Sequence, residues 1–597
     1  DRIYDENGEF VEKLSSGDWN PLVSANLPKR NTSTYTSVQD NFNIDWRIIP
    51  ALRLQGRFSY TRQFDRRDLF KSPESLDYST ETDPKKKGSY YLVNSRSDRF
   101  DGNLTLAYNK TIDKHMLNVG VGSNIMQSET EGESFTGVGF INPDMIFIGA
   151  ANAFQENTSP QGTYDKSRLV GFFTNVNYGY GNRYFLDFSF RSDGSSKFGR
   201  NSRFAPFWSL GVAWNVHNES FWHAHEKNAL KLRASVGSTG TTNFSSTQAL
   251  TTYLYDFSRE YNGNFGVSLA GYGNSSLKWQ TTLSYNVGVD FTFLHGLVVF
   301  NGDFYIKNTR SLLLPVTVAP STGFIDYVEN IGKLRNTGVE ARLRFNLIQD
   351  AVKDLRWNVT LSAFHNRSKI TQLSNQLETI NQYANDDRAN QGTVVYRQFE
   401  AGRSQTALMV VRSGGIDPAT GNEIYIKRNG EMTFEYNHND KIECGDMKPK
   451  IEGNVNTNLN WKGFNLYMLF KYQYGGKIYN ATLASKVEGV NPLKNADKRV
   501  LYDRWKEPGD HAKFRRIDDT SAPYQTTRLV FDNNLLALQS VSLSYELPRK
   551  ISQKMYMERV KLLLSSTDLF RLSSVKQERG TSYPFARTFS IGLNVTF

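Results

Sequence analysis

The chain has 597 residues with 71 Lys or Arg against 60 Asp or Glu, which gives a formal net charge of +11 at pH 7. Its mean hydropathy is -0.53, and the absence of any run of about 18 apolar residues excludes a transmembrane helix. The one cysteine, Cys444, excludes an intrachain disulfide framework.

The basic residues are spread along the chain, with PKKKG at 84–88 as a short run. This scatter is typical of a solvated surface, whereas a nucleic-acid site needs a basic patch, so we expect no nucleic-acid partner. Aromatic residues make up 13% of the chain. Aromatic side chains favour strands, and they also gather at bilayer interfaces.

Segments in which apolar and polar residues alternate recur from residue 42 to the end of the chain. Clear examples in chain order are FNIDWRI (42–48), WSLGVAWNV (208–216), TLSYNVGVDFTF (282–293), GFNLYMLFKY (463–472) and RTFSIGLNVTF (587–597). A strand turns successive side chains to opposite faces, so each segment has one apolar and one polar face. A membrane β-strand needs only about 10 residues of this kind.

About seventeen such strands are predicted, and no helical segment is of comparable quality. Their centres are near residues 43, 57, 104, 119, 174, 187, 212, 233, 288, 302, 342, 360, 456, 468, 541, 563 and 593. One short helix is expected around 140–154, inside a loop. Asp193-Gly194 is interpreted as a turn between two strands, because this dipeptide is typical of tight turns.

Long and short connections alternate along the chain. The short ones include IIPA (48–51), LHG (294–296) and WKG (461–463). The long loops are predicted at about 63–98, 123–168, 238–280, 308–336, 366–450 and 473–535. Bacterial outer-membrane barrels have long extracellular loops and short periplasmic turns, so this rhythm predicts an all-β, antiparallel transmembrane barrel.

Loop parity also gives each strand a direction. The last strand follows a long loop, so Phe597 should end at the periplasmic rim and residues 1 to about 36 should lie outside. Bacterial barrels normally have an even number of strands, and an open barrel leaves strand edges that a bilayer cannot satisfy. We therefore expect that 1–597 does not close a barrel alone and that upstream strands belong to the same barrel.

Several blocks, in order, resemble the C-terminal part of SusC/RagA-type TonB-dependent outer-membrane transporters. They are RYFLDFSFRSDGSSKFGRNSRFAPFWSLGVAWNVHNESFW (183–222), LKLRASVGSTG (230–240), LKWQTTLSYNVGVDF (277–291), NIGKLRNTGVEARL (330–343), GGIDPATGNEIYI (414–426), GDMKPKIEGNVNTNLNWKGFNLYMLF (445–470) and LALQSVSLSYELP (536–548). The resemblance implies a 22-stranded barrel, with about five strands and an N-terminal plug preceding residue 1.

The resemblance also implies partners and a location. They are a SusD-like surface lipoprotein, a plug-bearing N-terminal part or separate chain, the TonB–ExbB–ExbD complex, the lipid bilayer and a second copy in a dimer of SusC–SusD pairs. The implied location is the outer membrane of a Gram-negative bacterium of the Bacteroidetes type. The implied activity is TonB-energised uptake of oligosaccharides or oligopeptides.

Enzymatic signals are weak, and we expect no enzyme activity. RSDGSSKFG (191–199) lacks the G-x-S-x-G order of a nucleophile elbow. His223 and His225 are separated by one residue, but no third metal ligand is near them in sequence. NHNDKIECGD (437–446) has oxygen ligands at alternate positions without the order of an EF-hand, so no cofactor is assigned. Calcium in this loop or on the partner lipoprotein is kept as an alternative. Cys444 has no recognisable partner histidine.

Two sets of residues are candidates for a functional role. The polar faces of three strands carry charged residues that should face the lumen and contact a plug: Arg53, Arg57, Asp303, Glu340, Arg342 and Arg344. Tyrosines in the long loops can stack on sugar rings while neighbouring amides bind hydroxyls. The candidates for this substrate contact are Tyr253, Tyr255, Tyr261 and Tyr474.

The prediction is therefore a nutrient importer of the outer membrane. Two alternatives stay open. A passive porin or structural barrel predicts a wide, empty lumen, and an outer-membrane enzyme predicts a catalytic cluster at the extracellular rim.

Overall fold

The structure is a computed structural model that describes residues 3–14, 19–156, 158, 160–199, 202–224, 226–241, 249–271, 273–317, 326–330, 332–373, 381, 398–491, 497–576 and 587–597. Its main feature is an 18-stranded antiparallel sheet. One member, β5 (Ala153–Phe154), is a stub of 2 residues beside β4. The other seventeen strands (18 − 1) are the predicted ones.

The first eight strands are β1 (Arg30–Ile49), β2 (Leu52–Lys71), β3 (Ser89–Ile112), β4 (His115–Val138), β6 (Gln161–Tyr180), β7 (Tyr184–Ser195), β8 (Phe204–Asn215) and β9 (Ala229–Thr241). The other nine are β12 (Gln280–Phe293), β13 (Val298–Arg310), β16 (Lys333–Asp350), β17 (Leu355–Gln372), β22 (Ile451–Trp461), β23 (Phe464–Tyr474), β26 (Leu535–Glu546), β27 (Arg559–Ser573) and β28 (Thr588–Thr596). Each strand pairs with the next one in these lists.

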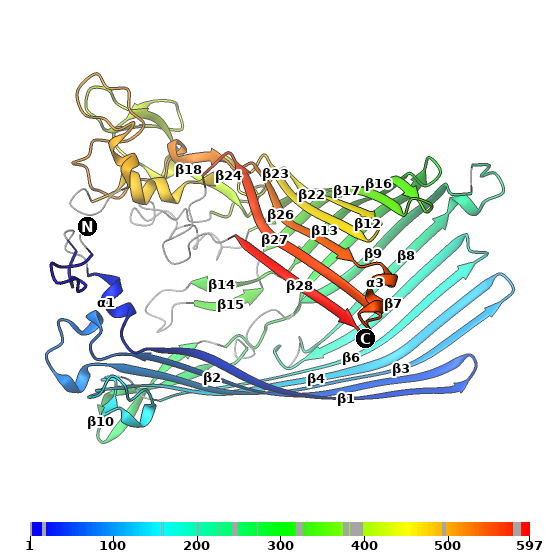
Figure 1. The fold of residues 1–597 in the computed structure, drawn as a ribbon, viewed down its shortest axis with the longest axis horizontal. Coiled ribbons are helices and arrows are strands. Elements are labelled where there is room, and N and C mark those ends of the chain that lie inside the picture. The colour runs from blue at the N-terminus through cyan, green and yellow to red at the C-terminus, as the bar shows by residue number, and fades with distance from the viewer. Residues whose placement is uncertain are drawn as a thin grey trace.

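The sheet curves into an incomplete barrel (Figure 1). Among the described residues, no pairing joins β1 to β28, so the ring is not closed there. This confirms the expectation that these strands do not close a barrel alone. The long connections gather at one end of the barrel, here called the loop end. The tight turns and the C-terminus lie at the other end, the turn end.

Smaller elements fill the connections. The additional strands are β10 (Thr252–Tyr261), β11 (Asn264–Gly271), β14 (Leu313–Thr317), β15 (Asp326–Asn330), β18 (Ala407–Ile416), β19 (Glu423–Ile426), β20 (Met432–Thr433), β21 (Lys441–Asp446), β24 (Lys477–Tyr479) and β25 (Val530–Asp532). The helices are α1 (Pro21–Ala25), α3 (Arg549–Lys554) and the π-helix η8 (Leu483–Glu488). Single 3-10 turns are η1 (Leu76–Tyr78), η2 (Pro84–Lys86), η3 (Ile148–Ala150), η5 (Val216–Asn218), η7 (His438–Asp440), η9 (Lys498–Leu501) and η10 (Thr527–Leu529).

Helices in the described part of the chain are all too short or too polar to cross a bilayer.

The tight turns follow from local backbone conformation. Lys462 and Gly463 link β22 to β23 with φ of 45° and 87°, which is the left-handed pair that matches the twist of a two-residue hairpin. A Cβ on Gly463 would lie 2.6 Å from the Glu546 carbonyl oxygen. Glycine is therefore required there both for its φ and for the close approach of the neighbouring strand.

One face of the sheet is apolar and exposed all along its circumference. Register places Val287 of β12 opposite Phe304 of β13, and both belong to this face. Examples of exposed fractions are 63% for Phe42, 60% for Val287 and 87% for Ile591. A continuous exposed apolar surface of this extent needs a nonaqueous neighbour, and a bilayer supplies it. The opposite, polar face therefore lines the interior.

Three local expectations were wrong. Asp193 and Gly194 do not form a turn but continue β7, paired with Ala205 and Phe204 of β8. Gly194 is needed because a Cβ would lie 2.6 Å from the Phe204 ring, so the glycine serves close strand packing. The region 140–154 contains the 3-10 turn η3 and the two-residue strand β5, not a short helix. The third error concerns strand length at the loop end.

Strands β2, β3, β4 and β6 extend into the ranges 63–98 and 123–168 that were predicted as loops. In these outer parts polar and charged residues interrupt the alternation, although the hydrogen-bond ladder continues and Phe70, Tyr90 and Leu92 pack there in a buried cluster. Cross-strand ion pairs support this extension. Arg62 Nε lies 2.6 Å from Asp98 Oδ1, and Lys166 Nζ lies 2.6 Å from Glu129 Oε2.

Candidate functional site

The interior polar face carries an ion cluster in the middle of the sheet. Arg233 of β9 donates from Nε to Asp290 Oδ2 of β12 at 2.8 Å, and its Nη1 lies 3.1 Å from Asp303 Oδ1 of β13. Asn301 Nδ2 donates to Asp290 Oδ1 at 2.8 Å. Gly288 lies between them, and a Cβ there would be 2.5 Å from Asp303 Oδ1. Glycine at this position thus leaves room for the guanidinium of Arg233 to contact the carboxylates of both Asp290 and Asp303.

The six charged residues proposed to face the lumen all lie on the polar face. Arg53 donates from Nε to Asp45 Oδ1 at 2.6 Å, and Asp303 belongs to the Arg233 cluster. Register places Arg57 opposite Asn43, Glu340 opposite Asp303, and Arg342 and Arg344 opposite Asn301 and Val299. The six fall into two groups, one on β2 and one on β13 and β16. Their contact with a plug stays a prediction.

The four candidate tyrosines are not brought together. Tyr253 of β10 is 64% exposed and Tyr474, at the end of β23, is 62% exposed. Strands β10 and β23 lie on opposite sides of the ring (Figure 1). Tyr255 and Tyr261 also belong to β10, but their side chains lie outside the described residues. A single sugar-binding platform made of all four is therefore not formed, and their contact with substrate stays a prediction.

Two long connections at the loop end fold together into a compact unit, here called the loop module. The first connection links β17 to β22 and contributes residues 407–446, and the second links β23 to β26 and contributes residues 477–532. Strands β18 to β21 form its sheet, and a parallel bridge joins Val411 to Thr526 across the two connections. Trp505 Nε1 donates to the Pro418 carbonyl at 2.9 Å, and its ring lies where a Cβ on Gly421 would be. Gly421 has φ of 72°. The GGIDPATGNEIYI block thus provides the glycine on which the second connection packs.

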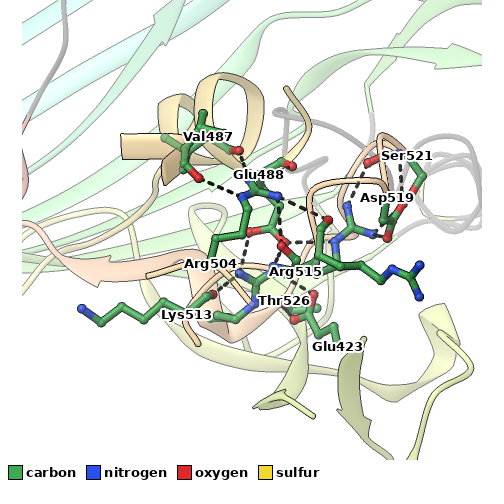
Figure 2. Close-up of polar contacts among 12 residues, drawn as sticks. Glu423, Val487, Glu488, Arg504, Lys513, Arg515, Asp519, Ser521 and Thr526 are labelled. Carbon is green, nitrogen blue, oxygen red and sulfur yellow. Dashed lines mark hydrogen bonds and ion pairs between the residues drawn. The ribbon is translucent and has the colours of Figure 1, made fainter. Parts of the chain in front are cut away.

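Buried charges hold the loop module together (Figure 2). Glu488, 1% exposed, accepts from Arg515 Nε at 2.9 Å and from Arg528 Nη1 at 2.8 Å. Arg528 Nη2 donates to Glu423 Oε2 at 2.9 Å, and Thr526 Oγ1 donates to Glu423 Oε1 at 2.6 Å. Arg528 therefore links β19 of the first connection to the π-helix η8 of the second.

A third buried arginine bonds to the backbone. Arg504 donates from Nη1 to the Arg515 carbonyl at 2.9 Å and from Nε to the Val500 carbonyl at 3.2 Å, and Nη2 bonds to the Val487 carbonyl. The Val487 bond satisfies a carbonyl group at the end of η8, and the other two satisfy carbonyl groups of η9 and of residue Arg515. Replacing water by such bonds is what allows an irregular loop to be buried.

Burial and neighbouring charges shift the pKa of these groups in opposite directions. Burial raises the pKa of Glu488, but the Arg528 and Arg515 charges outweigh it and hold that pKa below its ordinary value. Burial lowers the pKa of Arg528, but Glu423 and Glu488 outweigh it and raise the pKa overall. Burial lowers the pKa of Arg504. Glu488 and Arg528 therefore stay ionised at neutral pH. We call the network of Glu423, Glu488, Arg515 and Arg528 the buried clasp, because it holds the two connections together.

The other chemical candidates show no assembled site. Burial raises the pKa of the Cys444 thiol, which disfavours the reactive thiolate. His223 Nδ1 lies 2.6 Å from the Phe221 carbonyl, and His225 lies outside the described residues. Within the described ranges, no three His, Cys, Asp or Glu side chains are grouped to hold a metal, 437–446 included.

Sequence reasoning missed the buried clasp and the Arg233 cluster. The clasp joins Glu423 to Arg528, which are 105 residues apart, and neither lies in a segment with a regular period. Arg233 does lie on a recognisable polar face. Its two carboxylate partners could have been found by aligning the predicted strands in register.

A family model described as "TonB dependent receptor-like, beta-barrel" matches residues 3–403. Over its whole length the chain is 25% identical to TonB-dependent receptor P3 of Formosa agariphila and covers 61% of that protein. It is 24% identical to TonB-dependent receptor SusC of Bacteroides thetaiotaomicron, with 81% of the chain and 49% of that protein covered. The chain thus spans less than two thirds of the length of these relatives.

Solved structures show the same fold. The structure of the RagAB peptide transporter aligns with 100% of the chain at a TM-score of 0.86, with 21% identity, and 66% of that transporter chain is covered. The structure of the RagAB peptide importer in the 'open-open' state aligns with a TM-score of 0.83, also at 21% identity, with 100% of the chain and 65% of that importer chain covered.

Proposed function

The chain belongs to the TonB-dependent receptor-like β-barrel family, and from this premise we propose that it forms most of the wall of an energised outer-membrane importer. The family places it in the outer membrane as a β-barrel, and the family is one of transporters and receptors, not of enzymes. The observation that carries the proposal is the interior polar face, where Arg57, Glu340 and Arg342 form no ion pair with any described residue and lie on the same face as the self-paired Arg53–Asp45 and Arg233 clusters.

We infer that residues 1–597 are the C-terminal portion of the barrel. Strands β1 and β28 both have an edge that no described residue pairs, and a bilayer cannot satisfy such an edge. The relatives are longer than this chain, which leaves room for further strands and a plug. By loop parity the loop end faces outside and the turn end faces the periplasm, where TonB would act on the plug.

The proposed cargo is an oligosaccharide or an oligopeptide, taken up together with a SusD-like lipoprotein. The likeness to a protein named SusC and to a peptide transporter named RagAB supports such an importer and leaves the cargo class open. The loop module offers a rigid surface at the loop end on which a lipoprotein can sit. A dimer of such pairs is part of the same proposal.

Uptake in the producing bacterium tests the proposal. Labelled oligosaccharides and peptides are offered to the parent strain, to a strain lacking this transporter and to a strain lacking TonB. We expect uptake of one compound to be lost in both deletion strains. Uptake that persists without TonB would establish a passive channel instead. Purification of the native complex should recover a lipoprotein, and its absence would contradict the partner proposal.

A further inference from the structure

A row of aromatic side chains and one histidine ends the apolar face at the turn end of four neighbouring strands. Register places His115 of β4 opposite Tyr180 of β6. Tyr180 in turn lies opposite Tyr184 of β7, which lies opposite Trp214 of β8. Aromatic side chains of this kind mark the level at which a bilayer passes from hydrocarbon to headgroups. Groups just beyond the row therefore lie at the depth of lipid headgroups.

Two charged residues lie just beyond this row and contact its members. Arg183 belongs to the turn between β6 and β7, and Glu219 follows the turn η5, after β8. Glu219 Oε1 accepts from the Tyr184 hydroxyl at 2.6 Å and from Trp214 Nε1 at 3.0 Å. The exposed Phe221 packs edge-on against Trp214, with 6.5 Å between the ring centroids. We call Arg183, Tyr184, Trp214, Glu219 and Phe221 the rim cluster.

The Glu219 carboxylate can accept a further donor. The Tyr184 hydroxyl and the Trp214 N–H hold the pKa of Glu219 below its ordinary value, so the carboxylate is ionised at neutral pH. An ionised carboxylate has about four acceptor positions, and the one contact of Glu219 Oε2 with a described side chain is Arg183 Nη1 at 3.4 Å. The stacked rings of Tyr184 and Trp214, 6.4 Å apart, lie beside it. Because aromatic faces attract cations, this surrounding suits an ammonium group.

Arg183 supplies the opposite charge. Its side chain is 41% exposed, and its Nε and Nη2 groups have no partner among the described residues. A guanidinium binds a phosphate group through two parallel hydrogen bonds. The rim cluster therefore presents one cation and one anion at headgroup depth. A headgroup with both a phosphodiester and an ammonium group matches these two charges, whereas a purely anionic headgroup would bring a second negative charge toward Glu219.

We propose that the rim cluster is a binding site for one zwitterionic phospholipid, phosphatidylethanolamine. Arg183 binds the phosphodiester, and Glu219 with the neighbouring rings binds the ammonium group. The acyl chains lie along the adjoining apolar face, where Leu186 of β7 and Val212 of β8 are exposed and opposite each other in register. By loop parity the turn end faces the periplasm, so the lipid belongs to the inner leaflet. The inference goes beyond the proposed import function and does not depend on the cargo.

The test uses the full-length transporter, purified in a nonionic detergent and titrated with dioctanoyl phosphatidylethanolamine. Native mass spectrometry counts the bound lipid molecules and gives their affinity. Dioctanoyl phosphatidylglycerol, which has the phosphodiester without the ammonium group, is the comparison probe. Arg183→Gln, Glu219→Gln and Phe221→Ala alter the site. Arg559→Gln is the matched control, because Arg559 pairs with Glu546 at the same end of the barrel but on the interior face. Heat-modifiable migration on gels verifies that each barrel is folded.

We expect one phosphatidylethanolamine molecule to bind about tenfold more tightly than phosphatidylglycerol, the effect of one charge-assisted hydrogen bond. Arg183→Gln should lower the affinity for both lipids by about tenfold for the same reason. Glu219→Gln should abolish the preference between the two lipids. Phe221→Ala should lower the affinity for phosphatidylethanolamine by about threefold, because one ring beside the ammonium group is lost. Arg559→Gln should leave both affinities unchanged.

Three results would overturn the inference. Equal affinity of the unaltered transporter for the two lipids would exclude the assigned headgroup. Equal losses in Arg183→Gln and Arg559→Gln would show that the lipid is not bound at the rim cluster. If Arg183→Gln and Phe221→Ala lower the unfolding temperature but leave lipid binding unchanged, the rim cluster is a structural contact only. Phe221→Ala keeps the test decisive if Arg183→Gln does not fold, because it leaves the hydrogen bonds of Glu219 in place.

Discussion

The buried clasp of the loop module gives the sharpest stability prediction. Glu488→Gln keeps the size of the side chain but removes the charge that Arg515 and Arg528 share. Removing one partner of a buried ion pair costs about 3 kcal/mol, because the remaining charges stay buried and uncompensated. Local opening of the loop module should then become about 150-fold more frequent, since each 1.36 kcal/mol is a factor of ten.

Hydrogen–deuterium exchange of the purified full-length protein measures this effect locally. Peptides covering η8 and residues 513–529 should exchange about 150-fold faster, whereas peptides of barrel strands such as β3 and β4 should not change. Arg516→Gln is the matched control, because Arg516 pairs with Asp518 on the exposed surface and should leave protection nearly unchanged. Unchanged exchange in Glu488→Gln, or equal acceleration in both variants, would refute the clasp.

Three further predictions follow from the fold and the charges. Because the pKa of Glu488 is held below its ordinary value of 4.5, its contribution to stability is present above that value and is lost as the pH falls through its folded pKa. Pulse-labelled exchange after acid incubation should therefore show the loop module opening only at pH values below 4.5 while the barrel stays protected, and simultaneous loss of both would contradict this. Val287→Arg on the apolar face should destabilise the barrel by about 2–4 kcal/mol in denaturant titrations, whereas Asn286→Arg on the polar face should cost far less; equal effects would show that the faces are wrongly assigned. Gly463→Ala should slow barrel assembly, because the new methyl group meets the Glu546 carbonyl, and normal pulse-chase assembly kinetics would argue against that close approach.

The strands could be predicted from the sequence because one physical constraint governs each of them. A membrane strand must show apolar residues to lipid and polar residues to the interior. The regular alternation in TLSYNVGVDFTF (282–293) therefore predicts the strand β12. The turns at LHG (294–296) and WKG (461–463) could also be predicted, because tight turns between strands require residues with positive φ, and glycine adopts positive φ readily.

Other features could not be predicted because no local period encodes them. The outer parts of β2, β3, β4 and β6 stand beyond the apolar band and are held by ion pairs such as Arg62–Asp98. Gly194 has the sequence context of a turn, but it serves the approach of Phe204. Glu423 and Arg528 meet only because two long connections fold against each other.

The central claim is energised import through this barrel, and uptake under a protonophore tests it most directly. Cells of the producing bacterium are loaded with a radiolabelled cargo probe while the proton motive force is dissipated stepwise. Surface binding should persist, and accumulation should fall to zero together with the proton motive force. Accumulation that continues at an unchanged rate after complete dissipation would contradict the account and would establish the barrel as a passive pore.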